Sequence, residues 1–108
     1  MGKYQIRRTS SGQFRWTLKA TNGENLITSE EYTTKQNCLN GISSSKINVA
    51  DQNFQRKTSI SGQPYFNQIA GNGAILGTSE MYSNVYNRDA GIESTKRNAP
   101  TAIIEDLS

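Results

Sequence analysis

Hydrophobic and polar residues alternate with a period of two over the first thirty positions of the chain. The alternation is clearest over residues 13–20, where aromatic and aliphatic side chains occupy every second position. Such alternation is typical of a half-buried β-strand. Weaker alternation over residues 4–9 predicts a strand before it, and residues 24–29 are expected to return antiparallel to it. The pattern therefore predicts a three-stranded meander.

The hydrophobic period then changes to one that suits a helix. Residues 35–47 place Cys38, Leu39 and Ile42 on one side, which is a modest apolar stripe. A threonine just before this segment can cap its first turn. Gly41 lies in the middle of the predicted helix, at a cost of about 0.5–1 kcal/mol relative to alanine.

The whole pattern occurs twice, at an offset of fifty residues. Residues 22–48 and 72–98 share a turn, a Thr-Ser-Glu-x-Tyr motif and a helical segment without a gap, which indicates one supersecondary unit used twice. The second predicted helix, over residues 85–97, carries Gly91 at the position of Gly41. We expect the two glycines to mark a crossing at which the helix backbones approach closely.

The repeats are expected to interlock into a single domain over residues 1–108. Their approximate bounds are 3–50 and 53–100, and residues 101–107 stand in the register of a third copy of the opening strand. We therefore expect each helix to be followed by a strand that crosses to the other half of the sheet.

Two local features refine this picture. Asn22-Gly23 is expected to form a type I′ hairpin turn, in which both residues have positive φ. Pro64 occupies the position of Phe14 in the second repeat. Because proline cannot donate to a strand ladder, we expect an edge or a bulge at that point.

The ordered motifs resemble a known family. The pattern Gly-Gln…Ala-x-Asn-Gly…Leu-x-Thr-Ser-Glu-x-Tyr…Gly-Ile-x-Ser-x-Lys-x-Asn runs over residues 12–48 and again over 62–98. It is similar to the YegP-like family, also known as domain of unknown function 1508. The resemblance implies an α+β fold of tandem β-β-β-α-β repeats that form one curved antiparallel sheet around two crossing helices. It implies a monomer whose halves are related by a pseudo-two-fold axis, since single-repeat relatives reach this shape by dimerising, and it implies no activity.

Composition excludes several kinds of chemistry. The chain has no histidine and one cysteine. A Ser-His-Asp or Cys-His catalytic site is therefore excluded, and so is a zinc site built from histidine and cysteine ligands. Cys38 is expected to be a buried packing thiol, and a single cysteine favours a cytoplasmic location. No signal-peptide pattern or long apolar run is present. We expect a soluble protein without metal, cofactor, membrane contact or enzymatic activity.

The repeated Thr-Ser-Glu-x-Tyr motif is the polar motif that suggests a site. Its two copies could line one symmetric site or two equal ones, and its glutamates could form an acid/base pair if they lie within several ångströms. Alternatively, Ser and Glu satisfy backbone donors while Tyr closes the rim of the core. The candidate binding residues are Ser29, Glu30, Tyr32, Ser79, Glu80 and Tyr82.

A basic sheet face offers a second kind of site. Its candidate residues are Arg7, Arg15 and Lys19 on the first hairpin and Lys57 on the matching strand. A net charge of +3 is mildly basic, and such a face could neutralise a few phosphates. Base stacking would need more aromatic rings than this face offers. The sequence therefore favours a small binding or interaction module of unknown partner. The alternatives are a weak, sequence-independent nucleic-acid binder and a small-molecule pocket at the repeated motif.

Overall fold

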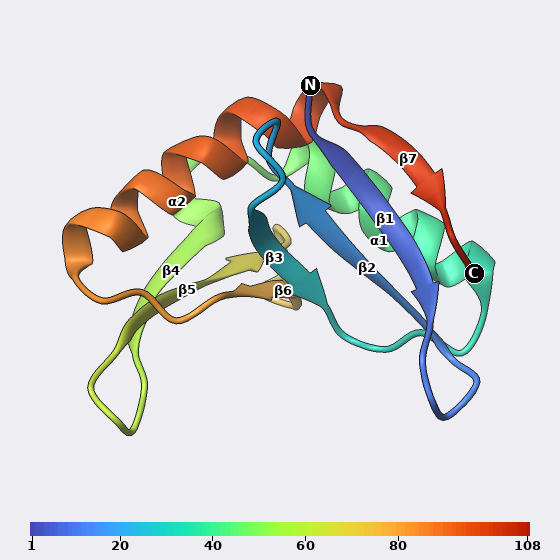
Figure 1. Ribbon diagram of the computed structural model, residues 1–108, viewed down its shortest axis with the longest axis horizontal. Helices are drawn as coiled ribbons and strands as arrows, with labels where there is room; N and C mark the ends of the chain where they lie inside the picture. The colour runs from blue at the N-terminus through green and yellow to red at the C-terminus, as the bar shows by residue number, and fades with distance from the viewer.

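Seven strands and two helices make up the fold, in the order β-β-β-α-β-β-β-α-β. The computed structural model describes residues 1–108. The strands and helices are β1 Lys3–Arg8, β2 Phe14–Lys19, β3 Asn25–Ser29, α1 Lys35–Ile47, β4 Phe54–Thr58, β5 Pro64–Ile69, β6 Ile75–Ser79, α2 Val85–Asn98 and β7 Ile103–Asp106. Short 3₁₀ turns, Asp51–Asn53 and Ala99–Thr101, connect each helix to the strand after it. The strands form one curved sheet in the order β4-β5-β6-β3-β2-β1-β7 (Figure 1).

These elements confirm the predicted α+β architecture of two like halves. Helix α1 has the bounds that the apolar stripe predicted. The hydroxyl of Thr34 caps it by accepting a hydrogen bond from the backbone N–H of Asn37 at 3.1 Å, which satisfies one of the free donors of the first turn. Asn84 caps α2 in the same way, accepting from the N–H of Asn87 at 2.8 Å.

The sheet is mixed, because β7 runs parallel to β1, with Tyr4 opposite Ile104 (Figure 1). The prediction of a fully antiparallel sheet was wrong at this edge. β7 is a third copy of the opening strand and follows α2 as β4 follows α1. The place beside β2 is already held by β1. β7 therefore lies outside β1, in the same direction.

β1 bonds to β7 through the backbone groups of its even-numbered residues. The carbonyl of Gly2 accepts from the N–H of Ile103 at 3.2 Å, and that of Ile6 accepts from the N–H of Leu107 at 2.8 Å. Odd-numbered residues of β1 are therefore the ones that bond to β2, since neighbouring residues of a strand point their polar groups to opposite sides.

The halves meet where β3 pairs antiparallel with β6. Thr28 lies opposite Thr78 at the centre of this short ladder, and Ile27 and Ser29 lie opposite Ser79 and Gly77. Because Thr28 and Thr78 are equivalent residues of the two repeats, the pseudo-two-fold axis passes between them.

Aromatic pairs form the centre of the core in each half. Tyr4 meets Trp16 edge-on at 5.2 Å between ring centroids, and their counterparts Phe54 and Phe66 meet in the same way at 5.9 Å. Such edge-to-face pairs contribute about 0.5–1.5 kcal/mol beyond their buried area. One continuous cluster links both halves; it includes Ile6, Leu18, Ile27, Cys38, Ile42, Ile92, Ala99 and Ala102.

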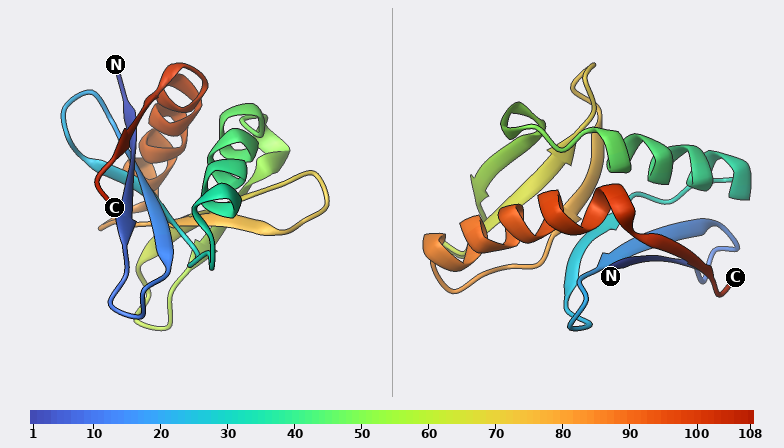
Figure 2. Two further views of the ribbon diagram at one scale, coloured as in Figure 1. Left: turned by 90° about the vertical axis from the view of Figure 1, so that its right-hand side faces the viewer. Right: turned by 90° about the horizontal axis from the view of Figure 1, so that it is seen from above.

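The mid-helix glycines do not mark a helix crossing, which corrects the sequence-based expectation. A β-carbon on Gly41 would lie 2.7 Å from Cζ of Tyr32, and one on Gly91 would lie 2.8 Å from Cζ of Tyr82. Each glycine thus makes room for the tyrosine of its own repeat. The helices approach each other through their C-terminal ends (Figure 2).

Two local expectations also need correction. Gly23 has φ of 88°, but no residue other than glycine has positive φ, so Asn22 does not complete a type I′ turn. Instead its side-chain oxygen accepts from the N–H of Glu24 at 3.0 Å. Pro64 is at neither an edge nor a bulge: it begins β5, an internal strand. The first position of a strand is one that tolerates proline.

Candidate functional site

The serines of the repeated motif are buried, and their hydroxyls are used within the fold. Oγ of Ser29 accepts from the backbone N–H of Trp16 at 3.0 Å and donates to the carbonyl of Glu30 at 2.8 Å. Oγ of Ser79 makes the same two contacts, with Phe66 and Glu80, at 2.9 and 2.8 Å. Each serine therefore supplies the acceptor for a strand N–H beside the core, which agrees with the serine part of the structural alternative. The glutamate part does not hold, because neither Glu30 nor Glu80 accepts a backbone N–H.

The tyrosines of the motif extend the sheet and cover the helix glycines. Tyr32 exchanges two backbone hydrogen bonds with Phe14, of 2.8 and 2.7 Å, whereas Tyr82 can only donate to Pro64, at 2.8 Å. Burial raises the pKa of Tyr32, and the nearby indole N–H of Trp16 opposes that change. Burial also raises the pKa of Tyr82, and two carboxylates add to the change.

The two glutamates of the motif are exposed and lie on opposite sides of the pseudo-two-fold axis. Glu30 is two residues beyond Thr28, and Glu80 is two residues beyond Thr78, in strands that run in opposite directions. Four strand residues separate them, which is roughly 13 Å at about 3.4 Å per residue. This geometry is inconsistent with a shared acid/base pair, because proton transfer needs hydrogen-bonding distance.

Helix α2 and the turn between β2 and β3 form the largest groove, of about 520 Å³, lined by Asn22, Ser94, Arg97 and Asn98 among others. A neighbouring groove of about 380 Å³ reaches Tyr82 and Gly91. Tyr82 is the one member of the six-residue candidate set that lines a groove. The repeated motif therefore does not form a common pocket.

Basic residues of the first hairpin lie together, but the predicted basic face is divided. Arg7 is directly opposite Arg15 on β1 and β2, and Lys19 is opposite Asn25, whose side chain donates to Glu80 at 3.5 Å. Lys57 lies on β4, five strands away from β1, or roughly 24 Å at about 4.8 Å per strand. The acidic side chain of Glu80 thus lies beside this face, and the fourth basic residue, Lys57, belongs to the other half.

Cys38 is fully buried, as predicted. Burial raises the pKa of its thiol to about 11, and Asp106 adds to the change, so the nucleophilic thiolate is scarce at neutral pH. No three His, Cys, Asp or Glu side chains gather into a group that could hold a metal ion. Neither helix has the length and hydropathy required to span a membrane.

Sequence reasoning missed a polar row across the helix-free face of the sheet. Residues in successive register pairs place polar side chains side by side on all seven strands. Alternation within each strand indicated its outward residues, but the register of β3 against β6 was needed to align the halves. The row consists of Glu105, Gln5, Thr17, Thr28, Thr78, Asn67 and Gln55.

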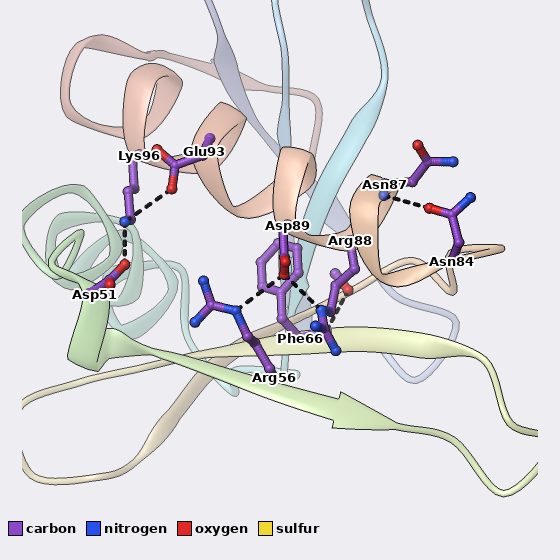
Figure 3. Close-up of polar contacts among 10 residues, drawn as sticks. Asp51, Arg56, Phe66, Asn84, Asn87, Arg88, Asp89, Glu93 and Lys96 are labelled. Carbon is purple, nitrogen blue, oxygen red and sulfur yellow. Dashed lines mark hydrogen bonds and ion pairs between the residues drawn. The ribbon is translucent and has the colours of Figure 1, made fainter.

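Ion pairs connect α2 to β4 and to the turn before it (Figure 3). The carboxylate of Asp89 lies 3.1 Å from Nε of Arg56 and 3.0 Å from Nε of Arg88. Burial acts to raise the pKa of Asp89, but hydrogen bonds from the two guanidinium groups outweigh it and lower the pKa. Lys96 pairs with Asp51 and with Glu93. One carboxylate thus serves two arginines beside β4.

The equivalent strands β1 and β4 differ from the pseudo-two-fold expectation. β1 and β4 are equivalent strands, yet β1 is covered by β7 while β4 has β5 as its one neighbour in the sheet. The basic residues Arg56 and Lys57 on β4 are exposed. The edge of β4 that faces away from β5 therefore has no strand partner, whereas the equivalent edge of β1 has β7.

These features define a small α+β protein of two interlocked repeats, in which the repeated polar motif is engaged in hydrogen bonds of the fold. The chain belongs to the family described as domain of unknown function DUF1508, whose model matches residues 10–55 and 60–106. The YegP-like resemblance of the sequence motifs is thereby confirmed.

Named relatives and solved structures support the same assignment. The chain is 42% identical over 59 residues to a UPF0339 protein encoded in the ptx operon 5′ region of Stutzerimonas stutzeri, and 39% identical over 59 residues to UPF0339 protein YegP of Escherichia coli K12. These alignments cover 54% of this chain and about half of each relative, 53% and 54%.

The solution NMR structure of UPF0339 protein SO3888 from Shewanella oneidensis matches with a TM-score of 0.92 at 42% identity, over 98% of this chain and 91% of that one. The structure of yegP from E. coli, a protein of unknown function, also gives 0.92, at 38% identity over 98% and 92% of the two chains. The fold predicted from the repeats is therefore confirmed, and the family is one of unknown function.

Proposed function

We propose that this protein is a non-catalytic interaction module that binds an extended segment of another protein along the free edge of β4. The observation that carries the proposal is the difference between equivalent strands: β1 accepts β7, whereas β4 accepts nothing. Addition of a strand to an open sheet edge is a recurring mode of peptide recognition. The buried serine hydroxyls and the distant glutamates support a role in binding rather than in catalysis.

The backbone groups available for such binding can be assigned. The N–H of Ser59 donates to the carbonyl of Gln63 at 2.8 Å, at the end of the β4–β5 ladder. Odd-numbered residues of β4 therefore bond to β5, as those of β1 bond to β2. Phe54 and Arg56 consequently direct their N–H and C=O groups away from β5, toward the free edge.

A proline at position 56 tests the proposal without breaking the β4–β5 ladder. Arg56→Pro removes an N–H that faces solvent, and edge strands tolerate such a change. Arg56→Ala is the matched control, because it removes the same side chain and its ion pair to Asp89 but keeps the N–H. The probes are octapeptides with the sequence of residues 101–108, TAIIEDLS, a neutral version TAIIQNLS and a basic version TAIIKKLS.

We expect at least one of these peptides to shift the backbone amide signals of Phe54 and Arg56 in the full chain. Binding should be lost in Arg56→Pro and kept in Arg56→Ala. The proposal is wrong if no peptide binds, or if Arg56→Pro and Arg56→Ala bind equally. We further propose a cytoplasmic, monomeric protein, on the basis of the single buried Cys38 and the tandem repeat.

A further inference from the structure

We infer that the strand accepted by β4 is acidic and runs parallel to it, with one acidic side chain opposite Gln55 and a second opposite Arg56. This inference rests on the proposed function and specifies the chemistry and direction of the partner. It follows from a comparison of β4 with β1, where the same docking already occurs within the chain.

β7 shows what a strand on this kind of edge requires. Glu105 accepts a hydrogen bond from Nε2 of Gln5 at 2.6 Å and lies 3.4 Å from Nζ of Lys3. Asp106, opposite Ile6, pairs with Lys35 at 2.8 Å. Two acidic residues in succession are thus held by an amide donor and by lysines.

β4 offers matching groups that have no partner strand. Gln55 is the counterpart of Gln5 and is half-buried, and its side chain makes no hydrogen bond within the protein. Lys57, the counterpart of Arg7, is exposed beside it. Arg56 faces the position that corresponds to Asp106, and 41% of its side chain is accessible even though it pairs with Asp89.

Local charge selects an acidic segment over a second copy of β4. If two β4 strands paired antiparallel about Arg56, this residue would lie directly opposite Arg56 of the other chain, and like charges directly opposite each other destabilise a sheet. Asp89 is shared between Arg56 and Arg88, so it leaves positive charge unbalanced at this edge. Basic residues also protect an edge against non-specific pairing, which makes an acidic partner the selective one.

The parallel direction follows from the arrangement of β7. With the same direction and register, the acidic pair of an incoming strand reaches Gln55 and Arg56, and the apolar residues before it lie beside Asn53 and Phe54. The sites differ at two cationic positions. The counterpart of Lys35 is Val85, which is 57% exposed, and the counterpart of Lys3 is Asn53, whose side-chain amide donates to the carbonyl of Ile69. The second acidic residue therefore depends on Arg56 rather than on the helix.

The octapeptides described above test the inference by their rank order. We expect the dissociation constant to increase from TAIIEDLS to TAIIQNLS to TAIIKKLS, by roughly threefold to tenfold in total, as two exposed ion pairs predict. In the double variant Arg56→Glu, Lys57→Glu the order should reverse. A nitroxide on the peptide N-terminus should broaden the amide signal of Asn53 more than that of Thr58.

The outcomes separate this inference from the proposed function. Equal binding of the three peptides, each lost in Arg56→Pro, would leave strand addition intact and overturn the acidic preference. Stronger broadening at Thr58 would overturn the parallel direction. Signals that shift at Tyr4 and Ile6 instead would show that the peptide displaces β7 from β1, and would count against both. An increase of the sedimentation coefficient with concentration, without peptide, would identify a second copy as the occupant and overturn the acidic partner.

Discussion

The two halves of this protein share a backbone plan but complete it with different chemistry. Near the C-terminal part of α1, the hydroxyl of Tyr4 donates to Ser45, and Ser45 donates to Gln68 of the other repeat at 2.6 Å. The equivalent positions on the α2 side are Phe54, Thr95 and Leu18, and the hydroxyl of Thr95 bonds instead to its own helix. A buried polar chain in one place thus corresponds to apolar packing in the other.

Side-chain volume is also redistributed across the pseudo-two-fold axis. The ring of Trp16 comes within 3.4 Å of the position that a β-carbon on Gly77 would take. The counterparts of these residues are Phe66 and Ile27, a smaller ring and a larger aliphatic side chain. Dense interiors tolerate such exchanges when total volume is kept. The repeat therefore specifies the backbone fold of each half, while the side chains that fill the core differ between the halves.

The largest expected effect comes from filling the space that both halves keep for a tyrosine. We expect Gly41→Leu and Gly91→Leu each to lower the free energy of unfolding by about 3 kcal/mol or more, because the new side chain overlaps Tyr32 or Tyr82. Urea denaturation measures this loss, with the exposed change Ser43→Leu as control. Losses below about 1 kcal/mol would show that the tyrosine can move aside at little cost.

Deleting residues 101–108 would make the first half resemble the second by leaving β1 with a bare edge. It removes the ladder to β1 and the contacts of Lys35 and Lys46 with the tail. We expect a loss of about 2–4 kcal/mol, at about 0.5–1.5 kcal/mol per hydrogen bond, or association of truncated chains in analytical ultracentrifugation. A truncated chain that remains monomeric and equally stable would contradict the structural role of β7.

The buried polar chain can be converted toward its apolar counterpart. Gln68→Leu removes the acceptor of Ser45 and the donor to the carbonyl of Asn48, so we expect a loss of about 1–3 kcal/mol. Tyr4→Phe should cost less in the Gln68→Leu background than in the wild type, because the hydrogen-bonded chain is already broken. A double-mutant cycle from urea denaturation measures this coupling. Additivity within about 0.3 kcal/mol would mean that the hydrogen bonds joining Tyr4, Ser45 and Gln68 do not act as a unit.

The differences between the halves mark the limit of what the sequence could predict. Local period and caps predicted the strands and the ends of α1, because these depend on residues near one another in the chain. The partner of Gly41 could not be predicted, since it depends on how Tyr32 turns after β3. The free edge of β4 was missed for a similar reason. This edge is open because β7 pairs with β1 and not with β4, and the pairing of strands that are distant in sequence cannot be predicted from local patterns.

The acidic residues of β7 and of α2 provide the smallest and most specific comparison. The hydrogen bond from Lys35, with contacts from Ser108, holds the pKa of Asp106 well below its usual range, and the hydrogen bond from Gln5 lowers the pKa of Glu105. A carboxylate whose pKa is lower in the folded state stabilises that state above its unfolded pKa, near 4, and this contribution is lost as the pH falls.

We therefore expect the wild type to exceed Asp106→Asn in unfolding free energy at pH 7, and the difference to shrink as the pH falls from about 5 toward 2. Asp89→Asn should behave alike, because its pKa is also lowered. Both pairs are exposed, so the effects should be small and should decrease with added salt. Adding TAIIEDLS should alter the pH dependence of the difference between the wild type and Asp89→Asn, but not of the difference between the wild type and Asp106→Asn. The reason is that the peptide would bring new carboxylates to Arg56, the partner of Asp89. If the difference for Asp106→Asn does not change with pH, the ion pair to Lys35 does not hold β7 in place.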